Sequence, residues 1–264
     1  MNMKSGNRAQ YWFVIRELTG REIKRRYSRS KLGIIWSVLN PLLTMAVLSA
    51  VFTQLFARSI DNFPIYYLCG YLIWVLFTGA TNAAMTALVD NRMMLIKVKF
   101  PMQIFMLARV YTAFVNFLYS LIAFGAILIV FAGTEKYRII PGISWFFMPV
   151  IIVFVILFSL GIGYILATAY VFFGDVKHLY GVLTTLWMYL SAIFYPVDRL
   201  GPFMTRVIHF NPVFGYIDSL RCLVLFNQLP PVQEIVQMVA CGVVSYVIGR
   251  QIFLTNKNKI MQKL

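Results

Sequence analysis

The positions of the charged residues divide the chain into long apolar runs and short polar connections. Residues 32–57 carry no charged side chain, and further apolar runs follow at intervals. About 20 apolar residues suffice for a helix that crosses a bilayer, so each long run is a candidate membrane span. The pattern predicts six spans, at about 32–57, 62–89, 110–133, 147–173, 179–196 and 235–254.

The segment before the first span, residues 9–31, has a different pattern. One stripe at helical spacing consists of Trp12, Ile15, Thr19, Ile23 and Tyr27. Arg16 and Arg26 also fall on this stripe, so the amphipathicity is imperfect. A basic segment of this kind favours an interfacial helix on the inner leaflet. A disordered tail is the alternative, chiefly for residues 1–8.

The stretch after the fifth span is apolar but is interrupted by charged residues, so it cannot span as one helix. Asn211 followed by Pro212 is typical of a helix start, since Asn caps a helix and Pro fits its first position. Two short helices are therefore predicted, at about 200–209 and 213–226.

We expect these two helices to dip partly into the outer leaflet and return, because polar groups at that depth are tolerated when protein or water surrounds them. Residues 197–230 would then form a gate at the outer mouth. Asp218 and Arg221 are spaced to pair on the second helix. The predicted fold class is an all-α membrane protein with six transmembrane helices, an N-terminal interfacial amphipathic helix and two short re-entrant helices between the fifth and sixth spans.

The connection after the second span, residues 91–101, mixes basic residues with large apolar ones. Exposed apolar side chains of this size are poor choices for a solvated loop. The pattern favours a short helix that lies on a partner protein, with a solvated basic turn as the alternative.

Composition agrees with a membrane protein, since 60% of the residues are hydrophobic and 12% are charged. Soluble domains carry about 25% charged residues. The formal net charge of +15 raises the question of nucleic acid as a partner. On so apolar a chain, however, a basic surface more often faces anionic headgroups and the cytoplasm. We therefore expect membrane lipids rather than nucleic acid as partners.

The distribution of basic residues predicts the orientation. With the N-terminus inside, the inner segments hold 18 Lys and Arg residues and the outer segments hold 6. The positive-inside rule then puts both termini in the cytoplasm.

Several predicted spans carry hydroxyl, amide and aromatic side chains on one helical face. These candidate channel-lining residues are Trp36, Asn40, Thr78, Asn82, Tyr164, Thr184, Trp187, Ser191 and Phe194. Aromatic faces stack on sugar rings, and neighbouring hydroxyls and amides can bond sugar hydroxyls. The alternative is helix packing through small polar residues, which is common in membranes.

The sequence contains no motif for catalysis or metal binding. His178 and His209, the two histidines, fall on opposite sides of the predicted membrane, and neither H-E-x-x-H nor G-x-S-x-G occurs. The three cysteines show no paired spacing. Neither a metal site nor a catalytic site is predicted, and Asp175 is expected to cap the fifth span.

A phosphate-binding loop is absent as well. That motif needs Gly-Lys followed by Ser or Thr, and no Gly-Lys pair occurs anywhere in the chain. If ATP powers this protein, a separate protein supplies the ATPase.

Basic residues, an aromatic residue and a Leu-Gly pair lead into the first span. The pattern consists of Lys24, Arg25, Arg26, Tyr27, Ser30, Leu32, Gly33, Trp36 and Pro41. It resembles the start of type-2 ABC exporter permeases that export cell-surface polysaccharides such as O-antigen, capsule or teichoic acid. Residues 91–101 resemble that family's first coupling helix, and residues 192–196 with Asn211 and Pro212 resemble its outer gate region.

One position departs from the family pattern. Phe172 to Val176 lie where the family usually has Phe-Arg-Asp-Val, and Gly174 stands in place of the arginine. A contact made by that arginine in relatives is missing here unless Lys177 substitutes for it.

The resemblance implies one permease domain over residues 1–264 that pairs as a homodimer. Two copies of a separate ATP-binding subunit would dock on its inner loops and hold ATP and magnesium. The chain itself would be neither an enzyme nor a cofactor protein. It would move a lipid-linked polysaccharide across the bacterial cytoplasmic membrane.

The resemblance also suggests roles for individual residues. Residues expected to couple to the ATPase are Asn91, Arg92, Leu95, Lys97, Lys99, Phe100, Pro101 and Asp175. Residues expected to attract the lipid pyrophosphate at the inner leaflet are Arg21, Lys24, Arg25, Arg26 and Tyr27. Residues expected at the outer gate are Tyr195, Pro196, Asn211 and Pro212.

Two other function classes are left open by the residues. An exporter permease for a drug or a small lipid is the first, although such relatives typically lack the basic segment before the first span. A membrane enzyme acting on lipid-linked sugars is the second, and it would need clustered His, Asp or Glu residues at one membrane face.

Overall fold

The computed structural model describes residues 8–28, 32–33, 35–56, 62–97, 100–132, 139 and 141–264. These residues are mostly helical, and no β-strand occurs among them. The α-helices are α1 (Arg8–Tyr27), α2 (Ile35–Phe56), α3 (Phe63–Asp90), α4 (Arg92–Lys97), α5 (Gln103–Ala132), α6 (Met148–Phe172), α7 (Val176–Tyr189), α8 (Pro202–His209), α9 (Pro212–Leu225) and α10 (Val232–Lys263). Two 3-10 helices are η2 (Ile143–Phe147) and η3 (Val197–Arg199). The predicted all-α class is confirmed.

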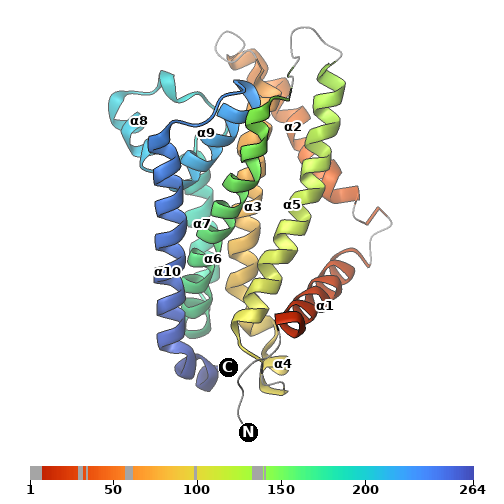
Figure 1. The fold of residues 1–264 in the computed structure, drawn as a ribbon, viewed down its shortest axis with the longest axis vertical. Helices are drawn as coiled ribbons and strands as arrows, with labels where there is room; N and C mark the ends of the chain where they lie inside the picture. Colours follow the sequence, from red (N-terminus) through yellow and green to blue (C-terminus); the bar gives the residue numbers. More distant parts are fainter. Residues whose placement is uncertain are drawn as a thin grey trace.

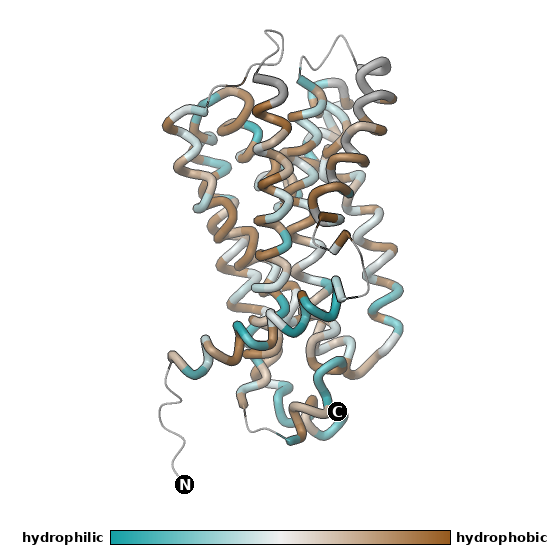
Figure 2. Tube along the Cα trace, turned by 90° about the vertical axis from the view of Figure 1, so that its right-hand side faces the viewer, coloured by the Kyte–Doolittle hydropathy of each residue, from teal (hydrophilic) through white to brown (hydrophobic). Residues whose placement is uncertain are grey.

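The long helices form a bundle along the long axis of the molecule, and short helices lie at its two ends (Figure 1). α8 and α9 lie at one end, which we call the outer end. α4 and the C-terminus lie toward the other, which we call the inner end. α1 crosses the bundle obliquely near the inner end, and its teal positions contrast with the brown of the long helices (Figure 2).

α3 is the central helix of the bundle and packs against α5, α6 and α9. A helix that is apolar on all sides favours burial on all sides, and the only charged residue of α3 is Asp90 at its end. Toward the outer end α3 contributes Phe77 to a cluster with Phe158 and Tyr216. Toward the inner end its Leu88 joins a second cluster.

α6 and α10 approach each other so closely that backbone meets backbone. A Cβ atom added at Gly249 would lie 2.1 Å from the carbonyl oxygen of Gly161. One added at Gly161 would lie 2.3 Å from the backbone of Ser245. Small residues permit this close packing between membrane helices.

Four described helices have the length and composition needed to cross a membrane. They are Phe63–Asp90, Gln103–Ile129, Ile143–Phe172 and Val232–Lys263. α2 occupies most of the range predicted for the first span. The chain is therefore a helical membrane protein, and the count of six spans stays a prediction.

The fifth predicted span differs most from the structure. A single helix over 179–196 was predicted, but α7 ends at Tyr189 and has 14 residues. At 1.5 Å per residue its length is about 21 Å, against about 30 Å for the hydrocarbon core. The chain then turns, and Ala192 adopts a positive φ of 46°. The prediction of one helix through residue 196 is wrong, because side chains of α9 hold the turn in place, as described below.

Candidate functional site

At the inner end, α1 is docked on α5 through the stripe that the sequence predicted. Ile15 packs against Ile104 and Ala108. The Thr19 hydroxyl donates to the carbonyl oxygen of Ala108 at 3.2 Å. The Thr112 hydroxyl in turn donates to Thr19 at 3.3 Å. This face of α1 is therefore a helix-packing face.

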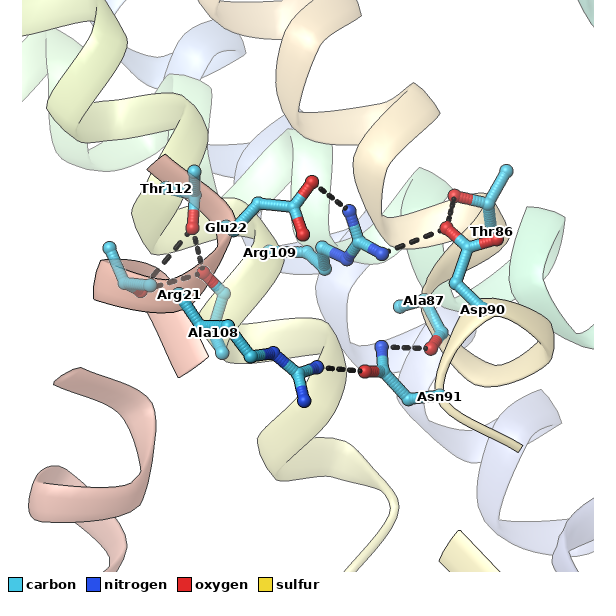
Figure 3. A network of polar contacts seen from close by, with 10 residues as sticks. Arg21, Glu22, Thr86, Ala87, Asp90, Asn91, Ala108, Arg109 and Thr112 are labelled. Atoms are coloured by element: carbon cyan, nitrogen blue, oxygen red, sulfur yellow. Dashed lines mark hydrogen bonds and ion pairs between the residues drawn. The ribbon is translucent and has the colours of Figure 1, made fainter. Parts of the chain in front are cut away.

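Arg109 of α5 joins three helices. Its Nη1 lies 2.7 Å from Oε1 of Glu22 on α1. Its Nη2 lies 2.8 Å from Oδ2 of Asp90 at the end of α3, and Thr86 donates to the same carboxylate at 2.9 Å (Figure 3). The Arg109 side chain is 12% exposed, so solvent screens these ion pairs less than it screens pairs on an open surface.

A second arginine ties α1 to the start of α4. Nη2 of Arg21 donates to Oδ1 of Asn91 at 2.9 Å, and Nδ2 of Asn91 donates to the carbonyl oxygen of Ala87 at 2.8 Å (Figure 3). Nη1 of Arg21 contacts the sulfur of Met94 at 3.1 Å. Because Asn91 is the residue before α4, this contact joins α1 to the start of α4.

The helix predicted over 91–101 is shorter in the structure. α4 runs from Arg92 to Lys97, and Phe100 and Pro101 follow it without helical structure. Lys99, for which ATPase coupling was predicted, lies outside the described residues.

The side chains of α4 divide into an anchoring face and a free face. Leu95 is buried and holds the helix to the bundle. Met93 and Ile96 are 66% and 61% exposed, and Arg92 and Lys97 are exposed beside them. A surface of exposed apolar groups within a basic rim is typical of a protein-docking site.

The remaining basic residues of α1 border two hollows. Arg26 lines a hollow of about 180 Å³ together with Arg109 and Asn116. The Tyr27 hydroxyl donates to Oδ1 of Asn116 at 3.4 Å. Arg25 lines another hollow, of about 340 Å³, that also contains Arg21.

Lys24, Arg25 and Arg26 are exposed, so their charges are available to an anion. Arg21, which was predicted to share that role, already uses its guanidinium for Asn91 and Met94.

Asp175 does not cap α7 as predicted. Its φ and ψ of −68° and −16° are helical, and its side chain makes no capping hydrogen bond. A capping residue adopts the extended region so that its side chain can reach back to the first amides. Asp175 is exposed, which leaves it free for a partner.

The candidate channel residues separate into exposed and packed groups. Trp36 and Asn40 of α2 and Asn82 of α3 are exposed. Tyr164 is 2% exposed and packs against Phe253 of α10. Ser191 is fully buried. The burial of Tyr164 and Ser191 favours the helix-packing alternative over a channel-lining role.

The other candidate channel residues serve contacts within the chain. Trp187 packs edge-on against Phe77 with ring centroids 5.1 Å apart, and Phe194 stacks on Tyr67 at 5.7 Å. The hydroxyl groups of Thr78 and Thr184 donate to backbone carbonyls of their own helices. These two threonines are half-buried.

At the outer end, Asn211 fastens the start of α9 to the end of α7. Its Oδ1 accepts from the Val213 amide at 3.0 Å, which confirms the predicted cap, and Pro212 is the first residue of α9. The same oxygen accepts from Nε1 of Trp187 at 2.7 Å. Its Nδ2 donates to the Leu190 carbonyl and to Ser191.

Arg221 of α9 holds the turn that follows α7. Its Nη2 donates to the carbonyl oxygens of Ala192 and Ile193 at 3.0 and 3.2 Å, and its guanidinium carbon lies 3.5 Å from the centre of the Tyr66 ring. Within the described part of the chain no ion pair joins Arg221 to Asp218, so the predicted pairing is wrong. The backbone carbonyls take up the guanidinium instead.

Tyr66 completes this outer anchor. Its hydroxyl donates to the carbonyl oxygen of Tyr195 at 3.0 Å, and Pro196 beside it is buried. The sequence pattern gave no role to Tyr66 or to Arg109. A single charge at the border of an apolar run was the available signal for Arg109, since such a charge needs a partner.

Comparisons with known proteins agree with this architecture. Residues 14–225 match the family described as ABC-2 type transporter. Among similar proteins, the O-antigen export system permease protein RfbA of Myxococcus xanthus is 28% identical over 97% of this chain and 96% of its own length. A protein of the same name from Klebsiella pneumoniae is 26% identical over 96% of each chain.

A more distant relative is the capsule polysaccharide export inner-membrane protein CtrC of Neisseria meningitidis serogroup B. It is 25% identical over 82% of this chain and 86% of its own length. The family match covers most of the chain and includes both the inner network and the outer anchor. This helical membrane protein belongs to the ABC-2 type transporter family.

Proposed function

We propose that this chain is the transmembrane subunit of an ABC exporter that moves lipid-linked cell-surface polysaccharide across the cytoplasmic membrane. Its relatives are named for O-antigen and capsule polysaccharide export, and they align with it over nearly their whole length. Two copies of the chain form the channel, and a separate subunit in two copies hydrolyses ATP.

The docking site for the ATPase is the exposed face of α4. Met93 and Ile96 supply the apolar contact, and Arg92 and Lys97 supply charge at the rim. Exposed Asp175 lies in the connection between α6 and α7 and adds a second contact. The absence of a Gly-Lys pair from the sequence supports a separate ATP-binding partner.

The observation that carries this proposal is the path from α4 to α1. Asn91 joins α4 to Arg21, and Arg109 joins the end of α3 to Glu22. An ATPase that pushes α4 therefore moves α1 with it, because both links act on adjacent residues of α1. Side-chain networks with discrete partners can carry such a displacement.

α1 is placed to act on a lipid-linked substrate. Lys24, Arg25 and Arg26 are exposed near the end of α1 that leads into α2. Guanidinium and ammonium groups bind phosphate strongly, so these residues attract the pyrophosphate of the lipid carrier. With both termini in the cytoplasm, the basic end of α1 lies at the inner leaflet, where such a carrier is loaded.

The glycan itself follows the exposed polar faces of the spans. Trp36, Asn40 and Asn82 are exposed in the single chain, so they are available to line the channel between two copies. α8 and α9 form the outer gate, and Asn211 and Arg221 hold that gate to α7 in the state described.

Depletion of this chain in its own organism tests the proposal. We expect surface glycan to fall while lipid-linked glycan accumulates at the inner leaflet, measured by surface labelling and by extraction of the lipid fraction. An unchanged surface glycan together with altered drug resistance would favour the small-molecule exporter instead. Copurification should also recover an ATP-binding subunit in equal number, and a Leu264 reporter found outside the cell would contradict the orientation.

A further inference from the structure

The outer end contains a cleft to which the proposed function assigns no role. The cleft has a volume of about 470 Å³ and is bordered by residues from α3, α9 and the segment around η3. This volume lies within the range of pockets for small ligands, about 300–1,000 Å³. The polar groups that line it include Tyr66, Asp198, His209, Asp218 and Arg221.

Arg221 has an unused hydrogen-bond donor in this region. The residue is 2% exposed, and its Nη2 and Nε are taken up by backbone carbonyls. Its Nη1 is buried and finds no hydrogen-bond partner among the described residues. A buried donor without a partner costs free energy, so a group that reached Nη1 and accepted its hydrogen bond would recover that cost.

The acidic groups of the cleft form no ion pair within the described part of the chain. Asp198 and Asp218 come from different helices and line the same space. Asp218 is one helical turn from Arg221, yet these two form no ion pair in the described structure. Arg221 and both carboxylates therefore border one cleft.

Histidine and aromatic groups complete the lining. Nδ1 of His209 lies 2.7 Å from the Thr205 carbonyl oxygen, which can only accept, so Nδ1 carries the proton in that contact. Nε2 of a neutral His209 is then an acceptor. Phe226, which is 66% exposed, adds a flat apolar surface.

This combination selects against simple ions. An anion would meet the carboxylates of Asp198 and Asp218, and a cation would meet the guanidinium of Arg221. A neutral polyol avoids both conflicts, because each hydroxyl donates to a carboxylate and accepts from a guanidinium at once. An aromatic face suits the apolar C–H surface of a sugar ring.

We propose that this cleft binds neutral sugar units of the translocated glycan at the outer mouth of the channel. The inference rests on the proposed function, which supplies the glycan as the ligand. That the cleft binds sugar is a separate claim with its own test. A neutral sugar there would receive a hydrogen bond from Arg221 and donate to Asp198 and Asp218, so the cleft would guide the glycan past α8 and α9.

Saturation-transfer NMR on the purified chain in lipid nanodiscs tests binding directly. The probes are the methyl glycosides of mannose, rhamnose, galactose and N-acetylglucosamine, each measured separately. We expect at least one to bind, and Asp218→Asn and Asp198→Asn each to weaken it about tenfold, the usual effect of losing one charged hydrogen bond. Glu234→Gln is the matched control, since its carboxylate lies near Asp218 but does not line the cleft.

Several outcomes would overturn the inference. Absence of binding by all four glycosides would do so, as would binding that both aspartate variants leave unchanged. Competition by inorganic phosphate or by calcium would assign the cleft to an ion. Calcium is a necessary control because Asp218, Cys222 and Glu234 bring one ligand atom each within 4.8 Å of the others.

The two proposals fail separately. A fall in surface glycan on depletion, together with no glycoside binding, would rule out the cleft as a sugar site and leave the exporter proposal intact. If the chain binds a glycoside but its depletion leaves surface glycan unchanged, the exporter proposal is wrong. The sugar site would then need another role. Neither Asp198 nor Asp218 anchors α7, so folding of both variants is expected to persist and is checked by thermal unfolding in the same nanodiscs.

Discussion

The inner and outer ends of this protein are both held by arginine, but in opposite ways. At the inner end, Arg109 and Arg21 contact side chains of Glu22, Asp90 and Asn91. At the outer end, Arg221 contacts backbone carbonyls and an aromatic ring. Side-chain partners can exchange when helices move, whereas a backbone carbonyl holds one turn in one shape. Under the proposed function the inner end would transmit movement, and the outer end would hold the turn until the gate opens.

Arg221→Leu should produce the largest effect, because it breaks the outer anchor. The variant loses hydrogen bonds to Ala192 and Ile193 and leaves those carbonyls buried without donors. We expect a loss of about 3 kcal/mol or more in the free energy of unfolding. Thermal unfolding in nanodiscs measures it.

Arg206→Leu is the control for Arg221→Leu. Arg206 is exposed on α8, so the same change of charge should leave unfolding nearly unaffected. Equal destabilisation by the two variants would show that Arg221 acts only through the net charge of the outer end.

Asn211→Ala should give the second largest effect. Its side chain caps α9 and also contacts Trp187, Leu190 and Ser191. Losing a cap costs about 1 kcal/mol, and the contacts to α7 raise the expected total to about 2 kcal/mol. Asn82→Ala removes an amide that is exposed on α3 and serves as control. If the two alanine variants unfold alike, Asn211 is a local cap and not an anchor of α7.

These two residues show what the sequence can and cannot reveal. The capping role of Asn211 was predictable, because the cap and its amide lie two residues apart. The role of Arg221 was not, since its carbonyl partners lie 28 and 29 residues away and nothing in the local pattern identifies them. The nearest acid in sequence, Asp218, was the natural prediction and is wrong.

The same distinction applies to the helices. α8 and α9 occupy the two ranges predicted for short helices, and a proline stands in the first turn of each while Asn211 caps α9. The length of α7 was mispredicted, because the apolar run continues through residue 196 while the turn is imposed by α3 and α9. An apolar run predicts that residues are buried, but not that they are helical. Here the end of the run forms a turn that is packed inside the protein.

Arg109→Gln should have a smaller effect on stability and a larger one on transport. Partly exposed ion pairs contribute up to about 1 kcal/mol, so the variant should fold. Without links to Glu22 and Asp90, however, α1 is no longer tied to α3 through this residue. We expect ATP hydrolysis by the assembled exporter to continue while surface glycan falls.

Arg16→Gln is the control for the inner end, because Arg16 is an exposed arginine of α1 with no part in the network. Arg21→Gln should resemble Arg109→Gln, since it breaks the second link, between α1 and Asn91. Normal export by both network variants would remove the proposed path from α4 to α1.

The smallest expected effect is that of Asp218→Asn, a pH-dependent change in stability at the outer end. Burial raises the pKa of the Asp218 carboxyl above its ordinary value of 3.8, while Arg221 and His209 oppose this shift and Asp198 adds to it. A carboxyl with a raised pKa binds more protons in the folded state than in the unfolded state, so its contribution to stability falls as pH rises from the unfolded pKa through the folded pKa. Asp218→Asn should therefore unfold less readily than the unchanged chain at neutral pH and lose this advantage toward about pH 4. Unfolding midpoints of the two proteins across that range measure the difference. A constant difference at every pH would mean that the carboxyl is fully solvated, and the outer cleft would then offer no buried acid to a sugar.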